Sequence, residues 1–327
     1  MIVFTEEEIR KHVQIDKRVI DIVEKGFNKL ASKEVELPPI MRVDIPENNG
    51  EVDVKTAYIK GYDHFAVKLS SGFFDNYRLG LPSGSGMMIL LSTKTGVPEA
   101  ILLDNGYLTD VRTAAAGAIS AKYLAKENIT TVGIIGAGSQ AYYQTLALTK
   151  TRKFSKLLIY SRTTKRAEEL SAKLKKHLDI EVIISNNAEK VIKKSDLVIT
   201  TTPSTKPIIK KEWLHPGLHI TAMGSDAEHK QELEAEVLTS TDLLVSDVKA
   251  QCFRLGELHH GIEKGILSKD SDIIELGEIT SKQIIGRIND EQITVCDLTG
   301  TGVQDTAIAL FAYEQLLMNG LGTKIGG

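Results

Sequence analysis

Hydrophobic residues change their spacing along the chain, and each change predicts a different kind of element. Residues 5–32 carry them at three- and four-residue intervals, which predicts helices. Thr5 followed by Glu8 has the spacing of a capping box at the first of these helices. Further on, short apolar runs separated by Gly and Asn turns predict strands at residues 41–45, 52–59, 65–70, 87–92 and 100–103. The N-terminal part is therefore expected to be α+β.

Residues 108–125 form an alanine-rich run with high helix propensity. Thr109 or Asp110 is expected to cap the N-terminus of this helix. Because small side chains let a helix pack closely, we expect it to link the first domain to the next.

The second part of the chain alternates strand-like and helix-like runs. Strands are predicted at residues 131–135, 156–160, 181–184, 197–200, 219–222, 243–245 and 294–296, with helices between most of them. Such alternation favours a parallel, doubly wound sheet. A last helix at residues 306–318 is expected to return to the first domain. The prediction is an α/β chain, with a doubly wound α/β domain at 127–305 and an α+β domain at 1–126 and 306–327.

A glycine turn, Thr131-Val-Gly-Ile-Ile-Gly136-Ala-Gly138-Ser-Gln-Ala141, joins the first predicted strand of this domain to a helix. Gly136 would allow a tight turn, Gly138 would let a pyrophosphate approach the backbone, and Ala141 is small enough for close helix packing. The N–H groups and dipole at the start of the helix favour phosphate. A glycine turn can join any strand to any helix, but this one has further strands behind it. The run therefore predicts a dinucleotide site.

The end of the next strand bears on which dinucleotide binds. NAD-selective domains carry an acidic residue there, which binds the ribose hydroxyls. This chain has Ser161, Arg162 and Thr163 instead. Because an arginine beside a hydroxyl residue can bind a 2′-phosphate, NADP(H) is favoured over NAD(H), with use of both as the main alternative. Arg162 could also be an ordinary surface residue of the next helix.

Composition and charge exclude several classes of function. The 327 residues carry a net charge of −3, so no basic excess favours nucleic acid. No apolar run approaches the ~18 residues of a membrane span, and the acidic start differs from a signal peptide. Cys252 and Cys296 form no metal-like or redox-like pair, and the adjacent His259 and His260 are expected to point different ways. We expect a cytoplasmic protein with no metal, nucleic-acid partner or membrane attachment.

Hydride transfer to or from an amino or imino acid requires cations for the carboxylate and a group that carries a proton. Arg42, Lys68 and Arg112 are candidates for the first task, although each alone could be an ordinary surface charge. Lys68 interrupts an apolar run, and a buried lysine usually has a partner or a task. Asp226 follows a predicted strand, where ligands gather in such sheets, or it caps a helix near Gln231.

Four stretches together resemble the ornithine cyclodeaminase and mu-crystallin family. They are Leu108-Thr-Asp-Val-Arg112-Thr-Ala-Ala-Ala, Gly133-Ile-Ile-Gly-Ala-Gly-Ser-Gln140, Ala222-Met-Gly-Ser-Asp226-Ala-Glu-His-Lys-Gln-Glu232-Leu and Asp297-Leu-Thr-Gly-Thr-Gly-Val-Gln-Asp305. The longer run at 104–117, with Gly72-Phe-Phe-Asp-Asn and Gly80-Leu-Pro, is similar to the branch found with ectoine-utilisation genes. The resemblance implies an α+β substrate and dimerisation domain, a Rossmann domain, and a homodimer built through the first.

The resemblance also implies roles for individual residues. It implies that Arg42, Lys68 and Arg112 bind the substrate carboxylate, that Lys68 also acts in catalysis, and that Asp226 is the acid/base. It implies cofactor contacts from Thr113, Gly136, Gly138, Ser139, Gln140, Ser161, Arg162, Thr163, Thr201, Thr202, Met223, Gly224 and Asp297. One departure concerns the cofactor. The family's NAD-binding cyclodeaminases carry an acid after the second strand, whereas Ser161-Arg162-Thr163 is closer to its NADP-using ketimine reductases.

The reaction that this resemblance favours is cyclodeamination of ornithine or a similar diamino acid, with hydride exchange at the α-carbon. Reduction of an imino acid, or dehydrogenation of an amino acid, with consumption of NAD(P)(H) is the close alternative. A non-catalytic NADPH-binding protein of the mu-crystallin kind is a further alternative.

Overall fold

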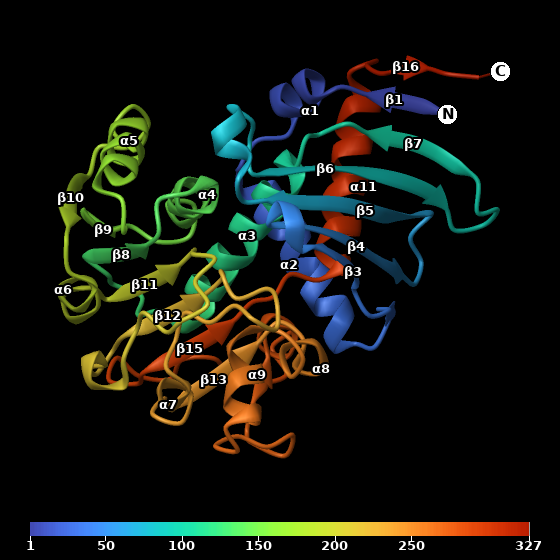
Figure 1. Cartoon of the computed structure of the whole chain (residues 1–327). Helices are drawn as coiled ribbons and strands as arrows, with labels where there is room; N and C mark the ends of the chain where they lie inside the picture. Colours follow the sequence, from blue (N-terminus) through green and yellow to red (C-terminus); the bar gives the residue numbers. More distant parts are fainter. Residues whose placement is uncertain (327) are drawn as a thin grey trace. The chain divides into compact units, whose positions relative to one another are not determined.

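The computed structural model describes residues 1–326 and contains two compact units, which we describe separately (Figure 1). Unit 1 comprises Met1–Arg112 and Thr301–Gly327, and unit 2 comprises Thr113–Gly300. Both boundaries fall earlier in the chain than the expected ones after residues 126 and 305. The first lies inside one continuous helix, α3 (Tyr107–Leu124), so the chain passes from unit 1 to unit 2 within a helix.

Unit 1 is built on a largely antiparallel sheet with the strand order β16-β1-β7-β6-β5-β4-β2, and β3 pairs with β4 as well. Its strands are β1 (Ile2–Phe4), β2 (Val35–Glu36), β3 (Met41–Ile45), β4 (Gly50–Ile59), β5 (His64–Phe73), β6 (Gly84–Ser92), β7 (Pro98–Leu102) and β16 (Thr323–Lys324). The five longer strands lie where the sequence predicts them. The sequence does not predict β1, β2 and β16, because two or three residues are too few to show an alternation.

The helices of unit 1 are α1 (Glu6–His12), α2 (Lys17–Ala31) and α11 (Gly302–Met318), with short 3-10 turns at η1 (Pro46–Asn48) and η2 (Asn76–Leu79). The capping box of Thr5 and Glu8 is confirmed at the start of α1. Helix α11 packs against α2, β4 and β5, and Figure 1 shows it running across the strands. The Thr306 hydroxyl donates to the Ala57 carbonyl at 2.8 Å and accepts from the Ala66 amide at 3.1 Å, which ties α11 to β4 and β5.

The start of α3 differs from the prediction. The helix begins at Tyr107, so Thr109 and Asp110 lie inside its first turn and do not cap it. The carboxylate of Asp104 accepts a hydrogen bond from the Leu108 amide at 2.7 Å instead. The capping acid therefore comes from the turn between β7 and α3, which has no helical periodicity of its own.

Unit 2 is a sheet whose strand pairs are all parallel, in the order β10-β9-β8-β11-β12-β15-β13-β14. The strands are β8 (Thr131–Ile135), β9 (Lys156–Tyr160), β10 (Glu181–Ser185), β11 (Leu197–Thr200), β12 (His219–Ala222), β13 (Leu243–Ser246), β14 (Ile274–Glu275) and β15 (Thr294–Asp297). The first five follow the spatial order 3-2-1-4-5 of a Rossmann sheet. The direction of winding changes between β8 and β11, and ligands bind beside such a point.

Both faces of this sheet are covered. Alternate residues of β8, β9 and β11 belong to separate hydrophobic clusters, such as Ile134 in one and Ile135 in the other. The helices of unit 2 are the second part of α3, α4 (Ser139–Leu148), α5 (Thr164–Leu174), α6 (Ala188–Lys194), α7 (Ala235–Leu238), α8 (Lys249–Cys252), α9 (Gly256–Glu263) and α10 (Leu276–Thr280), with a 3-10 turn at η3 (Lys211–Trp213). The predicted α/β, doubly wound arrangement is confirmed. Among the described helices, none has both the length and the apolar character needed to cross a membrane.

Candidate functional site

The glycine turn lies at the carboxyl end of β8, beside the switch point of the sheet. Gly136 has φ +121°, which strongly favours glycine. A Cβ on this residue would also lie 2.5 Å from the Thr201 hydroxyl, which comes from the loop after β11. The Thr201 amide donates to the Ile135 carbonyl at 2.8 Å, so the two loops are held together. Both the backbone conformation and the close approach explain glycine at position 136.

Gly138 is glycine for a different reason. It is the N-cap of α4, its φ is −91°, and a Cβ built on it would meet no heavy atom within 4 Å. Neither backbone strain nor an internal contact requires glycine here, so the position leaves open space at the start of α4. Ser139 and Gln140 form the first turn of this helix. The turn thus offers backbone N–H groups and the positive end of a helix dipole to an anion.

Helix α4 is fixed against α3 by a buried glutamine. The Gln144 side-chain amide donates to the Thr113 carbonyl at 3.0 Å and to the Gln140 side-chain oxygen at 3.2 Å. Gly117 of α3 lies so close to Gln144 that a Cβ would overlap its side-chain oxygen. Two expected cofactor residues, Thr113 and Gln140, are therefore linked through a residue that the sequence analysis does not single out.

The ends of neighbouring strands bring further expected cofactor residues to the same edge of the sheet. Ser161, Arg162 and Thr163 follow β9, and the Thr163 amide donates to the Ser161 hydroxyl at 3.3 Å. Arg162 and Thr163 are exposed. Thr201 and Thr202 follow β11, and Met223 and Gly224 follow β12. Because all these strands are parallel, their carboxyl ends meet at one edge.

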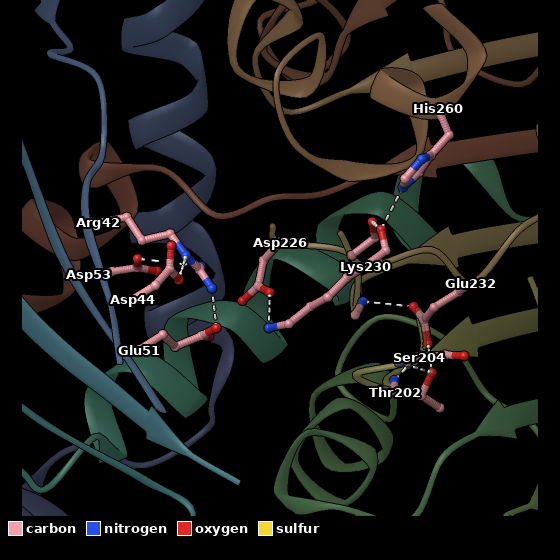
Figure 2. A network of polar contacts seen from close by, with 12 residues as sticks. Arg42, Asp44, Glu51, Asp53, Thr202, Ser204, Asp226, Lys230, Glu232 and His260 are labelled. Carbon is pink, nitrogen blue, oxygen red and sulfur yellow. Dashed lines mark hydrogen bonds and ion pairs between the residues drawn. The ribbon is translucent and has the colours of Figure 1, made fainter. Parts of the chain in front are cut away.

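A buried glutamate joins two of these loops (Figure 2). Glu232 accepts hydrogen bonds from the Thr202 amide at 2.6 Å, the Thr202 hydroxyl at 2.7 Å and the Gly224 amide at 2.8 Å. The hydroxyl of Thr200 donates to it as well, at 2.5 Å. Burial raises the pKa of Glu232 to about 7, against the effect of these donors. Glu232 therefore positions the loops after β11 and β12 relative to each other.

Asp297, at the end of β15, differs from the other expected cofactor residues because it is fully buried. Its carboxylate accepts from the Leu258 amide at 3.0 Å, and burial raises its pKa to about 8. A Cβ on Gly256 would lie 2.7 Å from this carboxylate. In this structure Asp297 holds the start of α9 through its hydrogen bond with Leu258. A direct contact with the cofactor would require Asp297 to become exposed.

Asp226 lies in the loop after β12, and its side chain is 39% exposed. The helix expected near Gln231 is absent there, since α7 begins at Ala235, so the capping explanation for Asp226 is wrong. Its carboxylate instead pairs with the Lys230 ammonium at 2.7 Å (Figure 2). The Lys230 side chain is only 6% exposed, so one end of this ion pair is buried and the other is accessible.

Unit 1 contains a cluster of buried charges around Asp305. The Lys68 ammonium lies 3.1 Å and the Arg112 Nε lies 2.8 Å from the same Asp305 oxygen. Arg112 also donates to the Gln304 side-chain oxygen at 2.8 Å. The side chains of Lys68 and Asp305 are 1% and 0% exposed, so Lys68 is buried with a partner, as the sequence predicts. We call Lys68, Arg112, Gln304 and Asp305 the cation cluster.

The pKa values of Lys68 and Asp305 are both lowered, and nearby positive charge contributes to both shifts. Burial and then the charge of Arg112 lower the pKa of Lys68 to about 7. Burial alone would raise the pKa of Asp305, but the charges of Arg112, Lys68 and Lys55 outweigh it and the pKa is lowered. Lys55 faces Lys68 across the β4–β5 pair. The other acid near Lys68 is Asp104, whose pKa burial raises to about 6.

Arg42 is placed differently from the other two expected cations. Its guanidinium binds three carboxylates, those of Asp44 at 2.8 Å, Asp53 at 3.6 Å and Glu51 (Figure 2). Arg42 pairs with Asp53 in the β3–β4 ladder, so it lies on the same sheet face as Lys55, two residues along the strand. Acids outnumber this arginine in its immediate surroundings. To bind a substrate carboxylate, Arg42 would have to release at least one of them.

Several residues of these arrangements have no role predicted from the sequence. Asp305, Lys55, Gln144, Lys230 and Glu232 are all buried and none is assigned a role. One signal was present in β4, where Glu51, Asp53 and Lys55 alternate with apolar residues. This alternation predicts a charged strand face, and the structure buries that face.

The sequence matches a known protein family over nearly its whole length. The profile of the ornithine cyclodeaminase/mu-crystallin family matches residues 1–320. The chain belongs to this family. An uncharacterized cyclodeaminase of Sinorhizobium fredii is 48% identical over 316 residues, 96% of each chain.

Two solved structures of family enzymes are also similar. The Delta(1)-pyrroline-2-carboxylate reductase of Thermococcus litoralis, in complex with NADH and L-proline, has a TM-score of 0.94 at 30% identity and covers 99% of this chain and 100% of its own. An archaeal alanine dehydrogenase dimer with bound NAD has a TM-score of 0.92 at 32% identity, covering 100% and 99%. The chain therefore has the full-length fold of enzymes that act on amino and imino acids.

Proposed function

We propose that this protein is an enzyme that transfers hydride at the α-carbon of an amino acid with a nicotinamide dinucleotide. The leading reaction is deaminating cyclisation of ornithine or a similar diamino acid. The observation that carries the proposal is the cation cluster, in which two buried cationic side chains, Lys68 and Arg112, share one oxygen of a single carboxylate. Two buried cationic groups beside one acid favour a small anion, and an α-carboxylate meets that need.

The residues present fit the dinucleotide. Gly138 leaves open space at the start of α4, and Gly136 permits the turn that leads to it. Gly136, Gly138, Ser139 and Gln140 would hold the pyrophosphate, as helix N-termini commonly do. When bound, the nicotinamide would accept the α-hydrogen as hydride and, in a cyclodeaminase, return it.

The cofactor is NAD(P), and we propose that NADP(H) is favoured over NAD(H). Arg162 is exposed at the end of β9, between Ser161 and Thr163, and no carboxylate follows this strand directly. A guanidinium beside two hydroxyl groups suits a 2′-phosphate. The similar structures contain NADH and NAD, so the preference depends on Arg162 alone.

Lys68 and Arg112 would bind the substrate carboxylate in this proposal, with Arg42 as the third cation. Because the pKa of Lys68 is about 7, an arriving carboxylate would stabilise its protonated form. Asp305 would keep both cations in place, since the two contact the same carboxylate oxygen. These residues would bind and orient the amino acid.

Asp226 would move the proton at the substrate nitrogen. It is accessible, and Lys230 holds its carboxylate from a buried position. A positioned carboxylate of this kind serves as a general acid/base. Thr113, Thr201, Thr202, Met223 and Gly224 would shape the cofactor site, and Glu232 would fix the last loops. Asp297 would hold the start of α9 through the Leu258 amide.

Reduction of a cyclic imino acid, or dehydrogenation of an amino acid, is the second candidate. The two similar structures with at least 30% identity are a pyrroline-carboxylate reductase and an alanine dehydrogenase, which favours it. It uses the same carboxylate site and the same acid/base, but the cofactor is consumed. A non-catalytic NADPH-binding protein is the remaining alternative.

We also propose a homodimer built through unit 1. Met41 and Val43 project from one face of β3 and are about half exposed, at 58% and 50%. Leu79 and Leu81 are exposed as well. Exposed apolar side chains of this kind are typical of a protein interface. Analytical ultracentrifugation of the wild type and of Val43→Glu tests this. If the dimer interface contains β3, the wild type should sediment as a dimer and the variant as a monomer.

One set of assays separates the three functions. In one assay the protein is incubated with ornithine and NAD+ or NADP+. In a second assay it is incubated with a cyclic imine and NADH or NADPH. Proline and ammonia without net cofactor change indicate a cyclodeaminase, stoichiometric oxidation of the reduced cofactor indicates a reductase, and tight binding without turnover indicates a binding protein.

The Asp226→Asn variant tests the acid/base assignment. We expect turnover to fall by about 100-fold or more, the usual contribution of general acid–base catalysis, with cofactor affinity unchanged. Glu228→Gln is the matched control, because this exposed acid lies in the same loop. Equal activity of the Asp226 variant and this control would remove Asp226 from the mechanism.

A further inference from the structure

Helix α9 brings two histidines and a glutamate together within unit 2. The His259 Nε2 lies 3.4 Å from one Glu263 oxygen, and the His260 Nδ1 lies 4.0 Å from the other. One ligand atom from each of these residues can be chosen so that all three lie within 4.8 Å of one another. The two rings are 5.2 Å apart, so the expectation that the adjacent histidines point different ways is wrong. We call His259, His260 and Glu263 the histidine–glutamate cluster.

The second nitrogen of each ring faces a backbone carbonyl. The His260 Nε2 lies 2.7 Å from the Lys230 carbonyl (Figure 2), and the His259 Nδ1 lies 3.4 Å from the Phe253 carbonyl. A carbonyl only accepts, so each of these ring nitrogens donates an N–H. In neutral rings, the lone pairs then lie on His259 Nε2 and His260 Nδ1. These are the two atoms that face Glu263.

The two rings are largely buried, whereas the carboxylate is exposed. The His259 and His260 side chains are 16% and 13% exposed, whereas that of Glu263 is 62% exposed. Two ring nitrogens and a carboxylate thus converge on one point beside the surface. A cation bound by all three groups would explain this convergence.

We propose that the histidine–glutamate cluster is a binding site for one divalent transition-metal ion of the Zn²⁺ class. Ligands about 2.0–2.1 Å from a tetrahedral metal are separated from each other by about 3.4 Å. The His259 Nε2 lies at this separation, 3.4 Å, from one Glu263 oxygen, and the His260 Nδ1 lies 4.0 Å from the other, so both carboxylate oxygens would face the ion. Two imidazoles and a carboxylate suit Zn²⁺, Ni²⁺ or Cu²⁺ better than Mg²⁺ or Ca²⁺, which prefer oxygen.

The backbone carbonyls complete the site. Histidines that bind metals usually donate their other N–H to a carbonyl or carboxylate, which fixes the ring and its tautomer. Here Phe253 and Lys230 supply these acceptors. Because Lys230 also holds Asp226, a metal at His260 would brace the same loop. The site does not depend on the proposed hydride transfer, since none of its three residues belongs to that chemistry.

Titration of chelator-treated full-length protein with ZnCl₂, followed by calorimetry, tests the proposal. We expect one Zn²⁺ per chain, and no comparable binding of MgCl₂. His259→Asn should weaken the affinity by about 100-fold, and Glu263→Gln by about tenfold or more, since each removes one ligand. His177→Asn is the matched control, because this exposed histidine of unit 2 lies outside the cluster, and it should leave the affinity unchanged.

Co²⁺ provides a second measurement. Substitution by this ion should give the intense visible absorption of a four-coordinate site, and His259→Asn should abolish it. Glu263 is exposed, so Glu263→Gln is expected to fold normally, and circular dichroism checks this for both variants. Zn²⁺ binding that is absent in the wild type, or equal in the wild type, His259→Asn and Glu263→Gln, overturns the proposal.

Discussion

Removal of the Asp305 carboxylate is the sharpest test of the cation cluster. Asp305→Asn keeps the size of the side chain but removes the negative charge that Lys68 and Arg112 both contact. All three side chains are at most 5% exposed, so water cannot replace the lost charge. Breaking a buried ion pair by removing one partner typically costs about 3–5 kcal/mol.

The matched control is Asp44→Asn, another aspartate of unit 1 that pairs with an arginine. The Asp44 side chain is 63% exposed, and exposed pairs contribute about 0–1 kcal/mol. The two variants remove the same chemical group, so the difference between them isolates burial. We expect Asp305→Asn to lower the free energy of unfolding by at least about 2 kcal/mol more than Asp44→Asn does.

The loss should also depend on pH. The pKa of Lys68 is about 7, and without Asp305 it should fall further because one cause that raises it is removed. At pH values between the lowered pKa of Lys68 in the variant and 7, Lys68 of the folded wild type therefore binds more protons than Lys68 of the folded variant. The difference in the free energy of unfolding between the wild type and Asp305→Asn, which we call the stability gap, should therefore widen as the pH falls below 7. The widening is at most about 1.4 kcal/mol per pH unit.

The assay must report on unit 1, because the single tryptophan, Trp213, lies in unit 2. Hydrogen exchange of the β5 and α11 amides meets this need, since these elements carry Lys68 and Asp305. A loss of about 3 kcal/mol should lower protection there by about 100-fold or more. Similar protection in Asp305→Asn and Asp44→Asn, or a gap that narrows below pH 7, would refute the buried-cluster argument.

Three further predictions concern the proposed cofactor and substrate sites. Arg162→Ala should weaken NADPH about 10- to 100-fold, the value of one charged hydrogen bond, and change NADH little; equal losses in a fluorescence titration would refute the phosphate assignment. Gly138→Ala should leave thermal stability unchanged yet weaken cofactor binding. Gly136→Ala should weaken cofactor binding and also lower the free energy of unfolding by about 1–3 kcal/mol. Equal melting temperatures of the two variants would contradict the strain at φ +121°. Because Lys68 loses its charge above its pKa of about 7, KM for the amino acid should rise above that pH, and the rise should vanish in Lys68→Arg.

The order and type of the main elements could be predicted from the sequence. Residues in a strand alternate between two faces and residues in a helix recur at three to four positions, so neighbours in sequence are enough to show each pattern. The five longer strands of unit 1, the parallel strands of unit 2 and the capping box at Thr5 are all local features of this kind. Gly136 belongs with them, because a positive φ is a property of one residue and its turn.

Only the tertiary structure decided which charged groups meet. Lys68 and Asp305 are 237 positions apart and come together because α11 returns across β5. Glu232 binds Thr202 and Gly224 because β11 and β12 are neighbours in the sheet. His260 binds the Lys230 carbonyl although 30 positions separate the two residues. An ion pair or hydrogen bond acts over a few ångströms and leaves no period in the sequence, so its partners follow from strand order and packing. The sequence therefore supplied the candidate groups, and the fold determined their partners and their charge.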